Sequence, residues 1–116
     1  MKKKVETAYG VIGLGRFGEA LAMMLAQSGH EVIAVDKDEK KVKEMRQYTD
    51  CAFVADNLSS DTLKEIGIQN CDVVIICIGE KVDVSVLTTM SVIEMGVPRV
   101  IAKALSPEQG VVLSKL

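Results

Sequence analysis

The segment with the clearest chemical potential is a glycine-rich turn, Gly13-Leu14-Gly15-Arg16-Phe17-Gly18. It matches the pattern G-x-G-x-x-G, which indicates a phosphate site where it follows a strand and opens a helix. Gly13 then permits a tight turn, Gly15 lets a phosphate approach the backbone, and Gly18 lets the helix pack closely on the strand. The N–H groups at the helix start would bind the phosphates. A glycine-rich turn that binds nothing is the alternative.

A second candidate is Asp36, which ends an apolar run about 20 residues after the turn, the usual spacing of an acid that binds ribose. Its carboxylate can accept hydrogen bonds from both ribose hydroxyls. It would also repel a 2′-phosphate, so NADP is disfavoured, although the neighbouring Lys37 weakens that exclusion slightly. The alternative is an acid that only benefits from the dipole of the following helix.

Further polar residues follow the expected strands at the same edge of the sheet. The guanidinium of Arg16 can hold a phosphate bidentately, or it can be an ordinary solvated side chain. Asp56 and Asn57 lie where an adenine edge would be, and an Asx turn is the alternative. Gly79 and Glu80 flank the point where the strand order reverses. Together these residues predict an adenine nucleotide or dinucleotide and do not choose between ATP, ADP and NAD(H).

Residues for catalysis or for a metal are not found in this sequence. The single histidine, His30, precedes the second expected strand, at the sheet edge opposite the ligand, and a general base must lie within hydrogen-bonding reach of its substrate. No Walker A motif occurs. Cys51, Cys71 and Cys77 form no C-x-x-C pair, so we interpret them as structural thiols in a reducing compartment. We therefore predict neither a catalytic residue nor a metal site.

Short apolar runs alternate with longer helical stretches along the chain. The runs expected to form strands are Tyr9–Ile12, Glu31–Val35, Cys51–Val54, Asp72–Ile78 and Val100–Ala104. The stretches expected to form helices are Arg16–Gln27, the segment after Asp38, the segment from Ser59 or Ser60 to Gly67, Val82–Met95, and a last one opened by Ser106. The first helix should turn Phe17, Leu21 and Leu25 inward, and the second should bury Val42, Met45 and Tyr48.

This alternation predicts one α/β domain over residues 1–116, a Rossmann-type doubly wound parallel sheet with strand order 3-2-1-4-5. Apolar residues make up 48% of the chain and aromatic ones 3%, so the core must be aliphatic. The formal net charge of −2 gives no reason to expect nucleic acid binding. No apolar run approaches the ~20 residues of a membrane helix, so we expect no direct membrane insertion. We expect a fragment of a longer protein, truncated before a sixth strand.

The fourth helix has two apolar arcs on a helical wheel. We expect Val86, Leu87, Met90 and Ile93 to cover the sheet. The opposite arc contains Val84, Val92 and Met95 among small polar residues, and we predict that it contacts a second copy of the chain. The alternative is contact with a neighbouring helix of the same chain.

Several segments together resemble the RCK/KTN (TrkA-N type) domain of Ktr/Trk potassium uptake systems, with the Ktr branch the closer match. They are Val11–Gly18, Gly29–Asp36, Ile78 with Gly79, Leu87–Thr89 and Val100–Ala104. The resemblance covers nearly the whole chain. It implies that the glycine turn with Arg16 holds phosphates, that Asp36 holds ribose, and that Lys103 approaches the phosphates; an ordinary strand-end lysine is the alternative for Lys103.

The resemblance also implies a role. In that family the domain is a cytoplasmic regulatory subunit at the inner face of the membrane. It forms homodimers that assemble into a ring on a membrane-embedded potassium channel or transporter. Bound ATP, ADP or NAD(H) shifts the ring between conformations that gate transport. The competing hypothesis from the residues alone is the cofactor-binding half of an NAD-dependent dehydrogenase.

Overall fold

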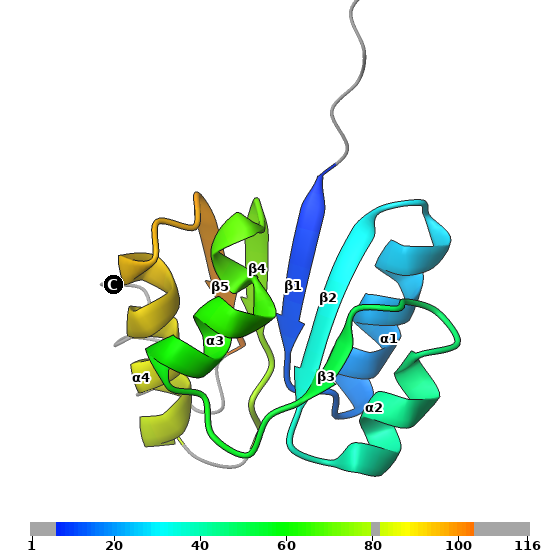
Figure 1. Ribbon diagram of the computed structural model, residues 1–116, viewed down its shortest axis with the longest axis horizontal. Helices are drawn as coiled ribbons and strands as arrows, with labels where there is room; N and C mark the ends of the chain where they lie inside the picture. The colour runs from blue at the N-terminus through cyan, green and yellow to red at the C-terminus, as the bar shows by residue number, and fades with distance from the viewer. Residues whose placement is uncertain (1–6, 80–81, 104–116) are drawn as a thin grey trace, which may run out of the picture.

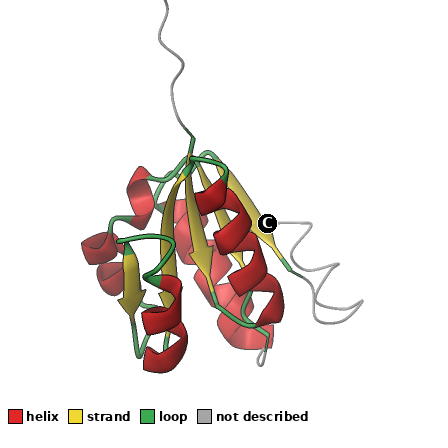
Figure 2. Ribbon diagram, turned by 90° about the vertical axis from the view of Figure 1, so that its right-hand side faces the viewer, coloured by secondary structure: helices red, strands yellow, loops and turns green. Residues whose placement is uncertain are grey.

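The fold is a five-stranded parallel sheet with helices on both faces (Figures 1 and 2). The computed structural model describes residues 7–79 and 82–103. In chain order the elements are β1 (Ala8–Ile12), α1 (Arg16–Gln27), β2 (Glu31–Asp36), α2 (Glu39–Met45), β3 (Ala52–Val54), α3 (Ser60–Ile66), the 3₁₀ turn η1 (Ile68–Asn70), β4 (Val73–Ile76), α4 (Val82–Glu94) and β5 (Arg99–Ala102). The strand order β3-β2-β1-β4-β5 confirms the predicted fold class.

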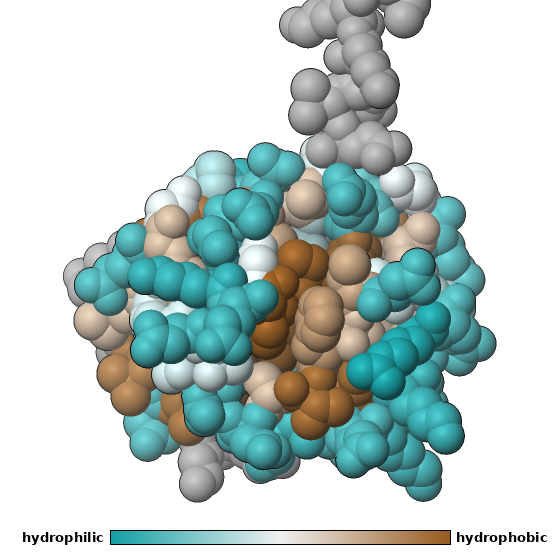
Figure 3. Space-filling view, in the orientation of Figure 1, coloured by the Kyte–Doolittle hydropathy of each residue, from teal (hydrophilic) through white to brown (hydrophobic). Residues whose placement is uncertain are grey.

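Two hydrophobic clusters cover the two faces of the sheet. One joins the sheet to α1 and α2 through Ala22, Val42 and Met45, and the other joins it to α3, η1 and α4. Neighbouring strand residues point to opposite faces, so Ile75 belongs to the first cluster and Ile76 to the second. Apolar side chains remain visible along the middle of the face that carries α3 (Figure 3). Among the described helices, none is long and apolar enough to cross a membrane.

Helix ends follow the predicted signals. The side chain of Asp38 accepts a hydrogen bond from the Lys40 N–H at the start of α2. Ser59 rather than Ser60 caps α3, and its hydroxyl accepts from the Thr62 N–H at 3.3 Å. Gly67 ends α3 with a φ of 100°, in the left-handed region that favours glycine.

Several predicted boundaries differ from the structure. β3 begins at Ala52 rather than Cys51, and β4 covers only Val73–Ile76. β5 begins at Arg99, and α4 ends at Glu94. The strand predicted over Asp72–Ile78 was too long because Cys77 and Ile78 line a cavity just beyond the end of β4. The sequence therefore stays apolar after the strand has ended. The turn η1 was not predicted. Ala104 and the last predicted helix, from Ser106, lie outside the described residues.

The prediction for the inner face of α1 was wrong at Phe17, whose side chain is 51% exposed. The buried residues of α1 are Gly18 and Ala22, while Leu21 and Leu25 are partly buried against the first cluster. A Cβ at Gly18 would collide with the carbonyl oxygen of Gly13. The helix therefore starts so close to the strand that only a small residue fits there, and Phe17 lies at the rim.

The predicted orientation of α4 was also wrong. Its buried residues are Ser85, Thr88, Thr89 and Val92. Leu87, Met90 and Ile93, which were expected to cover the sheet, are 63%, 42% and 38% exposed. The Thr89 hydroxyl donates to the Ser85 carbonyl oxygen at 2.7 Å. This bond within the helix satisfies the Thr89 hydroxyl, whereas the buried Ser85 hydroxyl has no hydrogen-bond partner among the described residues. The small semi-polar face packs on the sheet while large apolar side chains face outward.

Candidate nucleotide-binding site

A cavity of about 660 Å³ opens where the strands end at their carboxyl sides. Ligands of doubly wound sheets bind at this edge, next to the point where the strand order reverses. The predicted site residues that the structure describes all line it. They are Gly13, Leu14, Gly15, Arg16, Phe17, Gly18, Asp36, Lys37, Asp56, Asn57, Gly79 and Lys103. Glu80 lies outside the described residues.

Two glycines of the turn are required by the fold itself. Gly13 has a φ of +102°, and a Cβ there would lie 2.7 Å from the carbonyl oxygen of Cys77. Its N–H donates to the Val35 carbonyl oxygen at 2.8 Å, which ties the end of β1 to β2. Gly18 must lack a Cβ because α1 passes against Gly13. Any side chain at Gly13 or Gly18 would therefore force the backbone of the turn to move.

Gly15 is different, because no packing contact among the described residues requires it. Its φ of −69° suits any residue, and a Cβ there would meet no atom within 4 Å. Gly79, which also lines the cavity, likewise has open space where a Cβ would be. Both positions are therefore small without a packing reason among the described residues.

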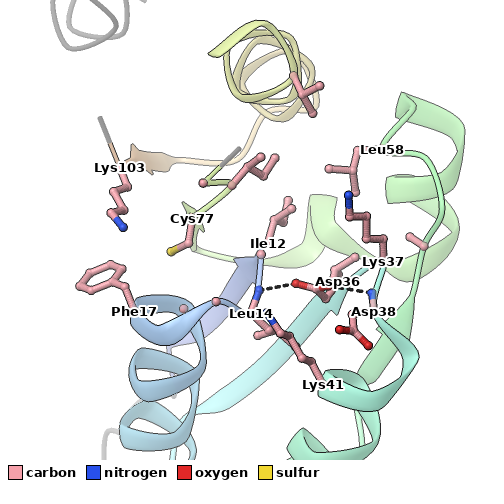
Figure 4. Close-up of a pocket in the computed structure, with 18 of the residues that line it drawn as sticks. Ile12, Leu14, Phe17, Asp36, Lys37, Asp38, Lys41, Leu58, Cys77 and Lys103 are labelled. Carbon is pink, nitrogen blue, oxygen red and sulfur yellow. Dashed lines mark hydrogen bonds between the residues drawn. The ribbon is translucent and has the colours of Figure 1, made fainter. Parts of the chain in front are cut away.

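Asp36 is half-buried at the end of β2 and already accepts two backbone hydrogen bonds (Figure 4). Its Oδ2 accepts from the Leu14 N–H at 2.6 Å, and its Oδ1 accepts from the Asp38 N–H at 2.7 Å. A carboxylate has about four acceptor positions, so two remain for other donors. The carboxylate is fixed beside the glycine turn, where a ribose next to a bound phosphate would lie.

Cationic side chains lie on both sides of the cavity. Arg16, the first residue of α1, and Lys103, just after β5, lie on one side, and the Lys103 ammonium sits 5.6 Å from the centre of the Phe17 ring. Lys37 and Lys41 lie on the α2 side, and Lys41 extends toward the glycine turn (Figure 4). Asp36, Asp38 and Asp56 line the cavity as well. The Arg16–Lys103 side thus has two described cations and no described acid.

Asn57 lines the cavity and also serves the start of α3. Its Oδ1 accepts from the Ser59 N–H at 3.2 Å and from the Thr62 hydroxyl at 3.0 Å. This is the turn chemistry that was the alternative to adenine binding. Because the oxygen is engaged, the amide NH₂ is the group that Asn57 has left for a ligand.

The thiol of Cys77 lies beside Lys103 and Phe17 in the wall of the cavity (Figure 4). Burial raises the pKa of this thiol to about 11, and the nearby Lys103 charge opposes the rise only in part. The thiol therefore stays protonated at neutral pH and is a weak nucleophile. Cys77 acts as an apolar wall.

Sequence reasoning missed several residues that line the cavity, among them Asp38, Lys41, Leu58, Cys77 and Val84. Lys41 follows the capping Asp38 by about one helical turn, a spacing that could have placed it near the strand ends. Cys77 ends an apolar run and gave no polar signal. His30 is absent from the cavity lining; its ring contacts Tyr9 edge-on, with 5.1 Å between ring centroids. The described residues contain no cluster of potential metal ligands.

The comparisons with known proteins agree with this geometry. The model of the TrkA-N domain family matches residues 9–116. The Ktr system potassium uptake protein C of Bacillus subtilis (strain 168) is 40% identical over all of this chain and 51% of its own length. The Ktr system potassium uptake protein A of Vibrio alginolyticus is 40% identical over 98% of this chain and 52% of its own length. The chain thus spans about half the length of these relatives.

A solved structure supports the fold independently. The NAD(P)-binding domain of an exopolyphosphatase-related protein from Archaeoglobus fulgidus superposes with a TM-score of 0.77 over 92% of this chain and 80% of that one, at 20% identity. At that identity the likeness concerns the fold alone. The family model and the Ktr relatives both extend over nearly all of the sequence, and the chain belongs to the TrkA-N domain family.

Proposed function

We propose that this domain binds an adenine nucleotide, ATP, ADP or NAD(H), at the glycine turn and thereby regulates a potassium uptake system. The observation that carries the proposal is Gly15. Gly15 has an ordinary φ, faces open space and loses more backbone entropy on folding than another residue would, so no packing contact among the described residues explains it. A phosphate that approaches the backbone at this point gives the missing reason, because a Cβ would occupy its place.

The remaining site residues have matching roles in this proposal. N–H groups at the start of α1 and the guanidinium of Arg16 bind phosphate oxygens, with Lys103 on the same side of the cavity. Asp36 accepts from the ribose hydroxyls, and Asp56 and Asn57 face the adenine edge. The carboxylate of Asp36 disfavours the 2′-phosphate of NADP, and the nearby Lys37 and Lys41 reduce that discrimination.

The test is calorimetric titration of the domain and of Gly15→Ala with ATP, ADP, NADH and NADPH. We expect the domain to bind the first three, and NADPH markedly less well. Gly15→Ala should remain folded with a melting temperature close to that of the parent domain, because its Cβ meets no atom within 4 Å. It should lose at least about tenfold in nucleotide affinity, or ~1.4 kcal/mol. Unchanged affinity in Gly15→Ala, or equal affinity for NADH and NADPH, would contradict the proposed binding mode.

In the intact protein, we propose that copies of this domain form homodimers and a ring on a membrane-embedded potassium channel or transporter, at the inner face of the membrane. Two relatives that match the whole domain are named as Ktr potassium uptake proteins, which supports this role over hydride transfer. The competing dehydrogenase half would show substrate-dependent NADH oxidation by the intact protein. A regulator binds nucleotide without that turnover.

A further inference from the structure

The glycine turn is tied to the end of β2 by two consecutive backbone N–H groups. Gly13 donates to the carbonyl oxygen of Val35 at 2.8 Å, and Leu14 donates to the Asp36 carboxylate at 2.6 Å. The second bond is short and charge-assisted, which is the stronger class of hydrogen bond. Both acceptors belong to adjacent residues of one strand, so the turn cannot shift relative to β2 without breaking them.

These two anchors determine which N–H groups stay available. Those of Gly13 and Leu14 are used inside the domain, whereas the first N–H groups of α1 have no partner within the helix. The anchored turn therefore fixes the start of α1 before any ligand arrives. Preorganised donors bind an anion more tightly than donors that must first be ordered, because the ordering cost is already met during folding.

We propose that Asp36 is a positioning residue for the phosphates as well as the ribose-binding residue, so that a single carboxylate couples recognition of both ligand parts. The inference rests on the proposed nucleotide site. Asp36 acts on the phosphates through the Leu14 N–H and does not touch them. Two acceptor positions of the carboxylate hold the Leu14 and Asp38 N–H groups, and the other two serve the ribose hydroxyls.

Asp72 provides a matched control at the opposite edge of the sheet. Asp72 directly precedes β4, which pairs with β1, and its Oδ2 also accepts a backbone N–H of the neighbouring strand, that of Ala8, at 2.8 Å. Asp72 does not line the cavity. Removing its carboxylate costs a similar bond between strands, without touching the glycine turn.

The experiment is a thermodynamic cycle on the purified domain. Calorimetry measures the affinities of ADP and of 2′,3′-dideoxyADP, which lacks both ribose hydroxyls, for the parent domain, Asp36→Ala and Asp72→Ala. We expect Asp36→Ala to reduce the affinity for ADP about 100-fold and the affinity for dideoxyADP about tenfold. DideoxyADP has no ribose hydroxyls for Asp36 to bind, so its affinity falls only because the turn is less ordered. Asp72→Ala should change neither affinity by more than about twofold.

A second measurement needs no ligand. Amide hydrogen exchange of the free domain should show a protected Leu14 N–H that exchanges at least about tenfold faster in Asp36→Ala and is unchanged in Asp72→Ala. Asp36→Asn keeps the shape and one acceptor oxygen, so it carries the same tests if the alanine variant does not fold. An unfolded variant is recognised by global loss of protection, whereas a loosened turn affects the amides near Leu14.

The outcomes separate the two proposals. If Asp36→Ala leaves dideoxyADP affinity within twofold, Asp36 acts on the ribose alone and the inference is overturned, while the nucleotide site stands. If the parent domain binds none of ADP, ATP and NADH, the proposed function fails. In that case, or where dideoxyADP binds too weakly to measure, hydrogen exchange at the Leu14 N–H is the deciding measurement. Protection that is lost in Asp36→Ala supports the hydrogen bond from Leu14 to Asp36 as the anchor of the turn. Rapid exchange of this N–H in the parent domain refutes it.

Discussion

The charge of Arg16 should distinguish ligands that carry phosphates from ligands that lack them. It is exposed and begins α1 at the cavity. We expect Arg16→Ala to weaken ATP binding by about 1–3 kcal/mol, the scale of a charge-assisted hydrogen bond, and to change adenosine binding little. Arg99→Ala is the matched control, since Arg99 begins β5 at the opposite edge and does not line the cavity. Equal ATP affinity in the domain and Arg16→Ala would place this guanidinium in solvent.

Most residues of the cavity could be predicted because the rule that places them is simple. Parallel strands bring their carboxyl ends to one edge, so Asp36, Asp56 and Gly79 were grouped correctly from the sequence, while Lys103 was placed there by the family resemblance. The use of their atoms was harder to predict. That Asp36 binds the Leu14 N–H and Asn57 caps α3 depends on distances between segments, which no local pattern contains.

Among the elements, α4 leads to a prediction about assembly. The face of α4 that is free to contact a second copy is opposite to the face expected from the sequence. Leu87, Met90 and Ile93 are exposed on α4, and Ile101 of the edge strand β5 is 45% exposed. A helix that buries its small polar side and exposes its large apolar side favours a protein partner outside. We expect Leu87→Glu to reduce self-association measured by light scattering, and to leave nucleotide affinity unchanged.

The control for that experiment is Met24→Glu on α1, because Met24 is as exposed as Leu87, at 61% against 63%. It places the same charge on an apolar residue of another helix. A parent domain that stays monomeric at high micromolar concentration, with and without nucleotide, would contradict the role of α4 in assembly by this segment of the chain.

Element types and order were largely predictable, while the helix faces were predictable only in part. Val42 and Met45 of α2 are buried as their spacing indicated. The helical wheel predicted the wrong buried face for α4 because apolar residues lie on both sides of the helix. The side with the smaller side chains is the one that packs on the sheet. Ser85, Thr88 and Thr89 are small enough to allow close approach to the sheet, and the Thr89 hydroxyl, which is bonded within its own helix, carries little burial cost.

For the whole molecule, the two buried thiols predict a loss of stability at alkaline pH. Cys77 belongs to the cluster on one face of the sheet and Cys71 to the cluster on the other. Burial raises the pKa of each to about 11 from 9.0; nearby acids add to the rise at Cys71, and Lys103 opposes it at Cys77. The folded state thus keeps protons that the unfolded chain releases above pH 9, so the free energy of unfolding falls between about pH 9 and 11.

Urea unfolding between pH 8 and 11 measures this dependence. The double variant Cys71→Ala, Cys77→Ala should show a shallower fall than the parent domain, because its clusters no longer contain a titrating group. Cys51→Ala is the control, since Cys51 is exposed. A double variant that follows the parent curve in parallel would assign the alkaline loss to other groups.

The central place of β1 has a consequence for how the protein is made. β1 pairs with β2 on one side and with β4 on the other, where Tyr9 meets Val73. During synthesis on the ribosome, β1, β2 and β3 can assemble early, but one edge of β1 keeps its hydrogen-bonding groups unpaired until β4 has emerged. The cavity is lined by Gly13 after β1 and by Lys103 after β5, so its lining is complete only once β5 has emerged. We therefore expect a nascent chain to pass through an aggregation-prone half-sheet before the cavity is complete.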